Sequence, residues 1–481
     1  MTDIRQRPHR RRRRHAIVAV AFLIAGFAKV DASSLRDGID ACAQTSSLHG
    51  AIVGLLIRDA ESGAALYELN TATRFVPASN VKLITAAAAL KTLGGAYRCT
   101  TRITASTGTV AAGVVRGNLY LIGSGDPMLR MEHIDDLARQ VAQRDIRSVE
   151  GRVIGDASLF SGNRWREGWN WDYLQWYFAP EVSGLSLNRN QVDVIVKPGL
   201  PGSPAHIRAE PETPYIRLKN DTQTVRAASS AAATIQFIRQ FDSRTIRVAG
   251  RIPVASPTIT QGMSVPRPAL FAAVELTERL RKHGVSVRHS PATGASPGTG
   301  LQTIATRISV PLSDMIVYMN KRSDNHAAEQ LLSLMGRHVH GQGTADAGLS
   351  AVAGFLRGCA VRDSDYRLAD GSGLSRHNLL SPQALVEVLR QMRDDKTFVD
   401  SLPIAGVDGT LRNRMKNSEA KGNVSAKTGA MSGVCALSGY VHRADGRRVI
   451  FSLLINNHVS SAQQVRAVQD RICEAVYRDN S

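Results

Sequence analysis

The sequence is poor in the residue types that build several common kinds of site. Aromatic residues make up 5% of its 481 residues, and cysteine occurs only five times. The cysteines form no CxxC pair and no cysteine–histidine pair with zinc-ligand spacing, so we expect no metal site and no other cofactor. Because five is odd, at least one thiol stays free. The five are Cys42, Cys99, Cys359, Cys435 and Cys473.

Acidic residues are in the minority. The chain has 60 Lys and Arg against 41 Asp and Glu, a formal net charge of +19, and seven of the arginines lie within residues 1–15. Beyond that segment no basic run with interleaved aromatics occurs, so we predict no nucleic-acid partner. The scattered basic excess favours at most peripheral contact with a membrane face or an anionic envelope polymer.

A membrane-spanning helix needs about 20 apolar residues. The uninterrupted run Ala16–Ala28 has thirteen, and it follows the arginine-rich start. A basic stretch, a short apolar core and the small residues Val30 and Ala32 are typical of a secretory signal peptide. We predict that residues 1–32 form such a signal and that the protein is exported to the periplasm or the extracytoplasmic cell wall. A short basic tail before a buried helix is the alternative.

Strand patterns occur near both ends of the chain. Apolar or alternating runs predict strands at Ala51–Arg58 and Ala64–Glu68. Three more strands and a closing helix are predicted near the other terminus, at 424–428, 434–441, 448–455 and 460–477. We therefore expect one mixed α/β sheet assembled from both ends of the chain, with the middle as an insertion.

The middle of the chain is rich in short strand patterns. We predict an inserted β-rich region over residues 99–275, of two small domains, which interrupts a main domain formed by residues 33–98 and 276–481. All four tryptophans fall between Trp165 and Trp176, beside three further aromatic residues. Such a cluster either closes the core of a small domain or lines a cleft for a bulky ligand.

Three short motifs carry chemistry: Ser79-Asn-Val-Lys82, Ser323-Asp-Asn325 and Lys427-Thr-Gly429. Each is weak alone, since Ser418-Glu-Ala-Lys421 also fits the pattern of the first. Context separates the two, because the first motif opens an apolar helix pattern over 81–93 whereas Ser418 stands in a polar stretch. The set of three, in this order, is unusual enough to indicate a site.

The first motif has the composition of an activated nucleophile. A serine in the first turn of a helix lies near the positive end of the helix dipole, which stabilises a developing oxyanion. Lys82, three residues after Ser79, lies on the same helix face. Burial beside another cation would lower the pKa of its amine, which then accepts the serine proton. An N-cap serine with a surface lysine is the alternative.

The other two motifs supply binding groups. Ser323 and Asn325 stand in a polar break between two helix patterns, where the amide would bind a substrate amide and the hydroxyl would relay a proton. Lys427 and Thr428 end a predicted strand and would bind a carboxylate. Gly429 would let a substrate lie against the strand edge.

The residue after the third motif has a further role in this scheme. The backbone N–H of Ala430 is positioned to act as the second oxyanion donor beside that of Ser79.

The order S-x-x-K, S-D-N and K-T-G resembles the motifs of penicillin-binding proteins and serine β-lactamases. The long stretch between the first two motifs is similar to that of the D-alanyl-D-alanine carboxypeptidase/endopeptidase family, the class C low-molecular-mass penicillin-binding proteins. Four further segments resemble that family, namely Gly123–Pro127, Asp156–Phe160, Asp370–Asn378 and Gly406–Leu411.

The resemblance implies a transpeptidase-like α/β fold, with a mainly antiparallel sheet and flanking helices, interrupted by β-rich inserted domains. It also implies a serine DD-peptidase that removes the terminal D-alanine from peptidoglycan stem peptides, with cleavage of D-alanyl cross-links as a second activity of the family. Ser79 would be the acylated nucleophile and Lys82 its base. β-Lactams would acylate the same serine and inhibit the enzyme.

The resemblance also implies a subsite. Asp156, Phe160 and Arg376 are similar to residues that in the family approach the side chain of the third stem-peptide residue, although a structural salt bridge is the alternative for the charged pair. The family often has Ser or Thr where this chain has Ala430. The missing hydroxyl leaves the N–H in place but reduces the contacts available to a carboxylate.

Two other functions stay open: a serine β-lactamase or esterase on the same scaffold, and a non-catalytic cell-wall-binding protein. Class A β-lactamases carry an acidic residue near an asparagine between their second and third motifs to activate the deacylating water. Glu68-Leu-Asn70 precedes Ser79 and therefore stands in the wrong place. We accordingly predict slow release of a penicilloyl adduct, and so inhibition by β-lactams.

Overall fold

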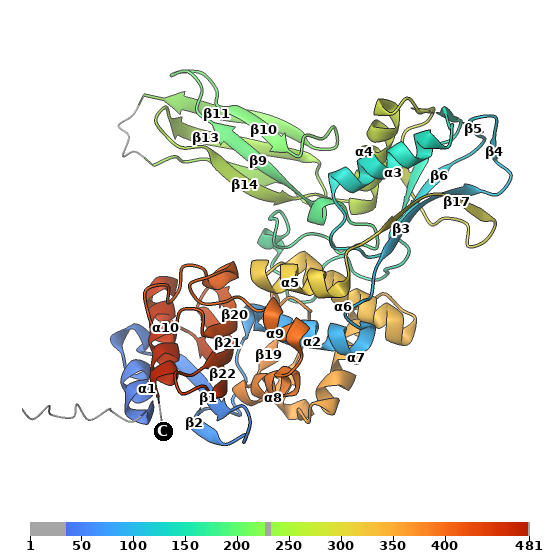
Figure 1. Cartoon of the computed structure of the whole chain (residues 1–481). Helices are drawn as coiled ribbons and strands as arrows, with labels where there is room; N and C mark the ends of the chain where they lie inside the picture. Colours follow the sequence, from blue (N-terminus) through green and yellow to red (C-terminus); the bar gives the residue numbers. More distant parts are fainter. Residues whose placement is uncertain (1–34, 227–231, 480–481) are drawn as a thin grey trace, which may run out of the picture.

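The computed structural model describes residues 35–226 and 232–479. A main domain of one sheet with helices on both faces carries two smaller lobes, one built around β9–β14 and the other around α3 and α4 (Figure 1). The predicted signal peptide, residues 1–32, lies outside the described residues. In the described part, none of the helices is both long and apolar enough to cross a membrane.

The sheet of the main domain has five strands in the order β2-β1-β22-β21-β20, and every neighbouring pair is antiparallel. The first strands of the chain pair with the last ones: Ile52 lies opposite Asn456, and Asp59 opposite Val449. The predicted sheet from both chain ends is thus confirmed. The strands are β1 (Ile52–Asp59), β2 (Ala65–Leu69), β20 (Val424–Met431), β21 (Val434–His442) and β22 (Arg448–Asn456).

Helices cover both faces of this sheet. One face packs against α1 (Leu35–Ala43) and α10 (Ala462–Arg478). The other packs around α2 (Val81–Leu93), whose first ten residues are all buried because the helix is apolar on every side. Around α2 lie α5 (Leu312–Arg322), α6 (Asn325–His340), α7 (Ala345–Gly358), α8 (Pro382–Met392) and α9 (Lys396–Ser401).

The first lobe of the inserted region holds a sheet in the order β16-β8-β6-β3-β17, which packs against α3 (Met131–Gln143) and α4 (Pro268–Lys282). A small sheet β15-β7-β5-β4 lies beside it. The strands are β3 (Thr100–Ser106), β4 (Val110–Ala111), β5 (Val114–Val115), β6 (Leu119–Ile122), β7 (Ser148–Val149), β8 (Val153–Asp156), β15 (Ser286–Val287), β16 (Ala292–Thr293) and β17 (Leu301–Ile308).

The second lobe packs two three-stranded sheets, β10-β9-β14 and β11-β13-β12. Buried apolar residues of both lobes, such as Leu121, Val194 and Val248, belong to one continuous core. The strands are β9 (Gln191–Lys197), β10 (His206–Glu210), β11 (Arg217–Val225), β12 (Gln236–Arg239), β13 (Thr245–Pro253) and β14 (Ile259–Ser264).

The inserted region ends later than residue 275, where we expected its boundary. β17 pairs with β3, from Leu301 opposite Ser106 to Ile308 opposite Thr100, and α4 packs on α3 and β8. Residues 276–308 therefore lie with the inserted lobes and not with the main domain. The pairing partner of an edge strand is a tertiary property, so the strand pattern of 301–308 alone did not reveal it.

Candidate active site

Ser79 lies in a short 3-10 turn, Ala78–Asn80, directly before α2. The preceding residue, Ala78, adopts φ +46°, a left-handed conformation that is uncommon outside glycine. Gly373 packs against it so closely that a Cβ there would lie 1.9 Å from the Ala78 carbonyl oxygen. Strained backbone of this kind persists only where the surroundings hold it, and here it sets the direction of the Ser79 N–H and hydroxyl.

Lys82 is completely buried and bonded to three acceptors. Its Nζ donates to Ser79 Oγ at 3.1 Å, to Asn325 Oδ1 at 2.7 Å and to the Ser372 carbonyl at 2.6 Å. Burial lowers the pKa of this amine from 10.5 to about 8, against the opposing charges of nearby carboxylates. When one proton leaves, two N–H groups still serve the amide and the carbonyl, and the free lone pair faces the Ser79 hydroxyl.

Lys427 of β20 is the second buried amine. Its Nζ donates to Ser323 Oγ at 2.8 Å and to the Thr428 carbonyl at 2.8 Å. Burial, together with the positive charge of Lys82, holds the pKa of Lys427 well below its usual value. Asn80 ties this strand to the nucleophile turn, because its Nδ2 donates to the Lys427 carbonyl at 2.8 Å. The structure thus brings all three sequence motifs into direct contact.

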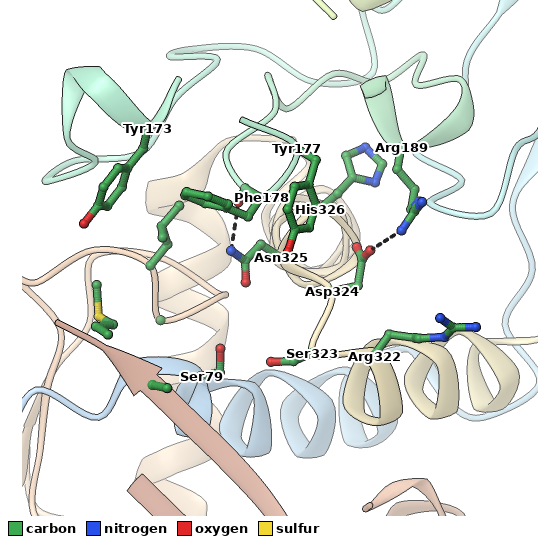
Figure 2. Close-up of a pocket in the computed structure, with 14 residues that line it drawn as sticks. Ser79, Tyr173, Tyr177, Phe178, Arg189, Arg322, Ser323, Asp324, Asn325 and His326 are labelled. Atoms are coloured by element: carbon green, nitrogen blue, oxygen red, sulfur yellow. Dashed lines mark hydrogen bonds and ion pairs between the residues drawn. The ribbon is translucent and has the colours of Figure 1, made fainter. Parts of the chain in front are cut away.

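The second motif is held between two helices. Ser323 ends α5 with φ +55°, and Asp324 caps α6 by accepting from the Ala327 N–H at 2.8 Å. Asn325 uses both ends of its amide: Oδ1 accepts from Lys82, and Nδ2 donates to the Phe178 carbonyl at 2.8 Å. The inserted region therefore contacts this motif directly (Figure 2).

Two cavities meet at Ser79, and both are also lined by Ser323 and Ala430. The first, of about 530 Å³, is walled by three aromatic residues of the inserted region: Tyr173, Tyr177 and Phe178. Figure 2 shows these rings above the Ser79 and Ser323 hydroxyls. We call it the aromatic cavity. The second, of about 480 Å³, runs along β20 to α10 and is called the α10 cavity.

The tryptophan-rich segment serves both of the purposes considered for it. Trp176 packs on the core of the inserted region, whereas Trp171 is exposed and Trp169 donates to the Asp370 carboxylate at 2.9 Å. The neighbouring Tyr and Phe residues, not the tryptophans, line the cavity at Ser79.

Asp156 and Phe160 do not line either cavity at Ser79, contrary to the predicted subsite. Asp156 Oδ2 accepts from the N–H and the hydroxyl of Ser296 at 2.8 and 2.6 Å, and Oδ1 accepts from the Ser158 N–H at 2.8 Å. Burial alone would raise the pKa of Asp156, but these hydrogen bonds outweigh it and lower the pKa. The Asp156 carboxylate therefore joins two segments of the inserted region, at Ser158 and Ser296, by hydrogen bonds. Phe160 packs between Gly125 and Gly343.

Arg376 also lines neither cavity at Ser79. Its guanidinium is exposed and donates to the Ser432 carbonyl at 2.6 Å, in the turn after β20. It forms no contact with Asp156, so the predicted charged pair is not assembled. The reason is that Asp156 faces the segment around Ser296, a tertiary contact that no pattern along the chain indicates.

Sequence reasoning missed the group that supports Lys82. Glu329 of α6 is fully buried; its Oε1 accepts from the N–H groups of Gly371 and Ser372 at 3.0 and 2.8 Å, and its Oε2 from Arg166 Nε at 2.8 Å. It therefore fixes the Ser372 carbonyl that Lys82 contacts. The signal for it was a single carboxylate between the apolar pairs Ala327-Ala328 and Leu331-Leu332 of α6.

His326 was also missed. It lines the aromatic cavity, is 3% exposed and has no hydrogen-bond partner at either ring nitrogen. Burial lowers the pKa of His326 to about 4, so the ring is neutral at pH 7.

The cysteines play no part in this site. All five are free thiols, and Cys99, Cys359, Cys435 and Cys473 are buried. Among the residues that the structure describes, no group of three or more His, Cys, Asp or Glu side chains could hold a metal ion.

The fold and the site together define a serine peptidase of the penicillin-binding-protein class. The chain belongs to the D-Ala-D-Ala carboxypeptidase 3 (S13) family, whose model matches residues 35–476. That match covers the main domain, both inserted lobes and all three motifs.

Individual relatives are similar over nearly the whole chain. A D-alanyl-D-alanine carboxypeptidase of Actinomadura sp. (strain R39) is 35% identical over 477 residues, which covers 95% of this chain and 88% of the relative. The crystal structure of penicillin binding protein 4 (dacB) from Haemophilus influenzae superposes with a TM-score of 0.81 at 26% identity, covering 91% of this chain and 98% of that one. The same protein in complex with a β-lactam gives a TM-score of 0.77 at 26% identity and the same coverage.

Proposed function

We propose that the family's D-Ala-D-Ala carboxypeptidase reaction proceeds in this chain through an acyl-enzyme on Ser79, with peptidoglycan stem peptides as substrate. The observation that carries the proposal is the contact between Lys82 Nζ and Ser79 Oγ at 3.1 Å, made by an amine whose pKa is lowered to about 8. A general base works best when its pKa lies near the operating pH.

The chemistry takes two steps. Ser79 Oγ attacks the carbonyl carbon of the penultimate D-alanine while its proton passes to Lys82 Nζ. The C–N bond then breaks, the proton passes to the leaving amine, and free D-alanine departs with an ester left on Ser79. Water hydrolyses that ester and restores the hydroxyl. Ser323, bonded to Lys427, is in place to relay a proton.

The oxyanion formed in each step lies between two backbone N–H groups, those of Ser79 and Ala430. Support comes from the close approach of β20 to the nucleophile turn. A Cβ on Gly429 would lie 2.7 Å from the Pro77 carbonyl oxygen and 3.1 Å from the Ser79 nitrogen. Glycine therefore lets the strand edge reach the turn, which brings the two donors to the same place.

The stem peptide lies in the aromatic cavity in this proposal, where Asn325 lines the wall and the three aromatic rings cover the chain of the substrate. The leaving D-alanine lies in the α10 cavity, beside Thr428. Cross-linked stem peptides carry the same D-alanyl carbonyl, so cleavage of cross-links is a second reaction that this cleft admits.

β-Lactams acylate Ser79 and are released slowly. Of the described residues that line the two cavities, Asp324 is the only acidic one, and its carboxylate already caps α6 and pairs with Arg189 at 3.3 Å. No carboxylate is left to activate a water against the ester. This favours inhibition by β-lactams over the alternative function of a β-lactamase, and an intact lysine–serine contact argues against a non-catalytic wall-binding protein.

The location of the enzyme follows from its proposed substrate. We infer that the protein is exported by the signal at residues 1–32 and acts in the periplasm or cell wall, where stem peptides occur. We further infer a two-part catalytic domain on either side of the inserted lobes.

Labelled penicillin tests the assignment. Wild-type protein should take up one label per chain, and Ser79→Ala none, since among the described residues the Ser79 hydroxyl is the only one that accepts a hydrogen bond from Lys82. Ser418→Ala is a matched control, because Ser418 opens the second S-x-x-K but donates to the Met415 carbonyl. It should label like wild type. Equal labelling of Ser79→Ala and wild type would refute the proposal.

A further inference from the structure

We propose that Arg466 and Gln469 of α10 bind the carboxylate of the leaving D-amino acid, in place of the hydroxyl that Ala430 lacks. The inference rests on the proposed function and adds to it a specificity site on the leaving-group side of Ser79. The same two residues would bind the carboxylate of a β-lactam.

The α10 cavity has the position that this role requires. It begins at Ser79 and Ser323 and reaches α10 past the edge of β20. Thr428 and Ala430 lie on one face of that strand, because side chains alternate along it and these two pair with Leu437 and Cys435. Those partners pack in the core that includes α10. A carboxylate beside Thr428 therefore points toward α10.

Ala430 leaves this face short of a donor. A serine or threonine at that position would offer a second hydroxyl two residues from Thr428, on the same face. The Thr428 hydroxyl itself is bonded to Thr410 Oγ1 at 2.8 Å. A carboxylate has two oxygens and accepts several hydrogen bonds, so one rotatable hydroxyl does not satisfy it.

Gln469 has an unused donor in this cavity. The residue is 1% exposed; its Oε1 accepts from Arg414 at 3.2 Å, whereas its Nε2 has no partner. A buried N–H without an acceptor costs free energy, and native proteins rarely retain one. An anionic ligand in the α10 cavity would supply the missing acceptor.

Arg466 provides uncompensated positive charge. Its side chain is exposed, and no described residue forms an ion pair with it, whereas Arg414 in the same cavity is paired with Asp470 at 2.6 Å. Cys435 lies opposite Ala430 in the sheet. Burial raises the pKa of the Cys435 thiol, and the positive charge of Arg466 partly offsets that rise. Arg466 and Ala430, where the hydroxyl is missing, line the same cavity.

The volume of the cavity fits the same ligand class. A single alanine fills a small part of about 480 Å³. The cavity therefore also admits a D-configured leaving residue with a longer side chain, provided that the carbon bonded to the leaving nitrogen carries a carboxylate.

The test compares the acylation rate by benzylpenicillin with that by its neutral methyl ester. Arg466→Gln should lower the rate with the acid about 10- to 100-fold, the effect of losing one hydrogen bond to a charged group, and leave the rate with the ester unchanged. Arg471→Gln removes the same charge from an exposed position of α10 outside the cavity, and should change neither rate. Adding Ala430→Ser to Arg466→Gln should restore part of the loss.

The inference is overturned if Arg466→Gln changes the two rates by the same factor, or changes neither. Gln469→Leu gives an independent check, with a smaller loss expected for the acid alone in protein whose circular dichroism matches wild type. If wild-type protein is acylated by neither compound, the proposed function is refuted. If wild type is acylated but Arg466→Gln affects both compounds equally, only the carboxylate site is refuted.

Discussion

Two buried ionisable side chains, Lys82 in the main domain and Asp156 in the inserted region, are held in opposite ways. The partners of Lys82 are acceptors, one of them the hydroxyl that faces both cavities, and burial moves its pKa toward the neutral amine. The partners of Asp156 are donors that lower its pKa and occupy its oxygens. The first environment prepares a proton acceptor and the second holds a loop in place, although both side chains have little area exposed to solvent.

Removing Lys82 is the strongest way to break this comparison. Lys82→Ala should reduce penicillin acylation about 1000-fold, because the proton of Ser79 loses its acceptor. The rate constant of acylation, followed with a fluorescent penicillin, is the measurement. In wild type that rate should rise with pH and level off above about pH 8, since only the neutral amine accepts the proton.

A flat pH profile between pH 6 and 9, or a Lys82→Ala variant that labels at the wild-type rate, would contradict the role of the amine. The thermal unfolding of the variant serves as a control for folding. The variant should still unfold in one cooperative transition, at a lower midpoint, because Asn325 Oδ1 and the Ser372 carbonyl lose their donor.

The ion pair between Arg166 and Glu329 links the two regions, since one partner lies in the inserted segment and the other in α6. Arg166→Ala should destabilise the protein by about 3–5 kcal/mol, because the carboxylate stays buried without its partner. Urea unfolding measures this. The exposed pair Lys396–Asp400 is the matched control, and Lys396→Ala should cost less than about 1 kcal/mol.

Arg166→Met combined with Glu329→Gln removes both charges and should recover part of the stability lost in the single variant. A single Arg166→Ala variant as stable as Lys396→Ala would show that the contact between the regions does not depend on this pair.

The smallest effect is expected at Asp156. Asp156→Asn should leave the acylation rate within about twofold of wild type and cost about 1–2 kcal/mol of stability, from weaker hydrogen bonds to Ser296. Its lowered pKa contributes stability that is present above pH 3.8 and lost as the pH falls below it. The Asp156→Asn variant lacks that contribution, so its stability should change less than that of wild type as the pH falls below 3.8. A tenfold change in the acylation rate would instead show that Asp156 contributes to substrate binding.

The central sheet and the three motifs were predictable because their signals are local. The nearly continuous apolar runs of β1 and β22 predict strands that are covered on both faces, and a helix that is apolar on all sides, such as α2, must lie at the centre. The predicted subsite residues Asp156 and Phe160 line neither cavity at Ser79, and Glu329 was missed, for one reason. Each depends on which distant segment meets the side chain, and hydrogen bonds from Ser296 or Arg166 leave no pattern along the chain.

The amino-acid sequence by itself determined which residues can react, since a serine, two lysines and an asparagine keep their chemistry in any fold. It also determined the elements that carry them, because strand alternation and helix apolarity are set by neighbouring residues. Only the tertiary structure decided that Lys82 is buried deeply enough for its pKa to fall to about 8. It also decided that Lys427 donates a hydrogen bond to Ser323 and that Ala430 lines the α10 cavity. Burial and contact across hundreds of residues exist only once the chain has packed.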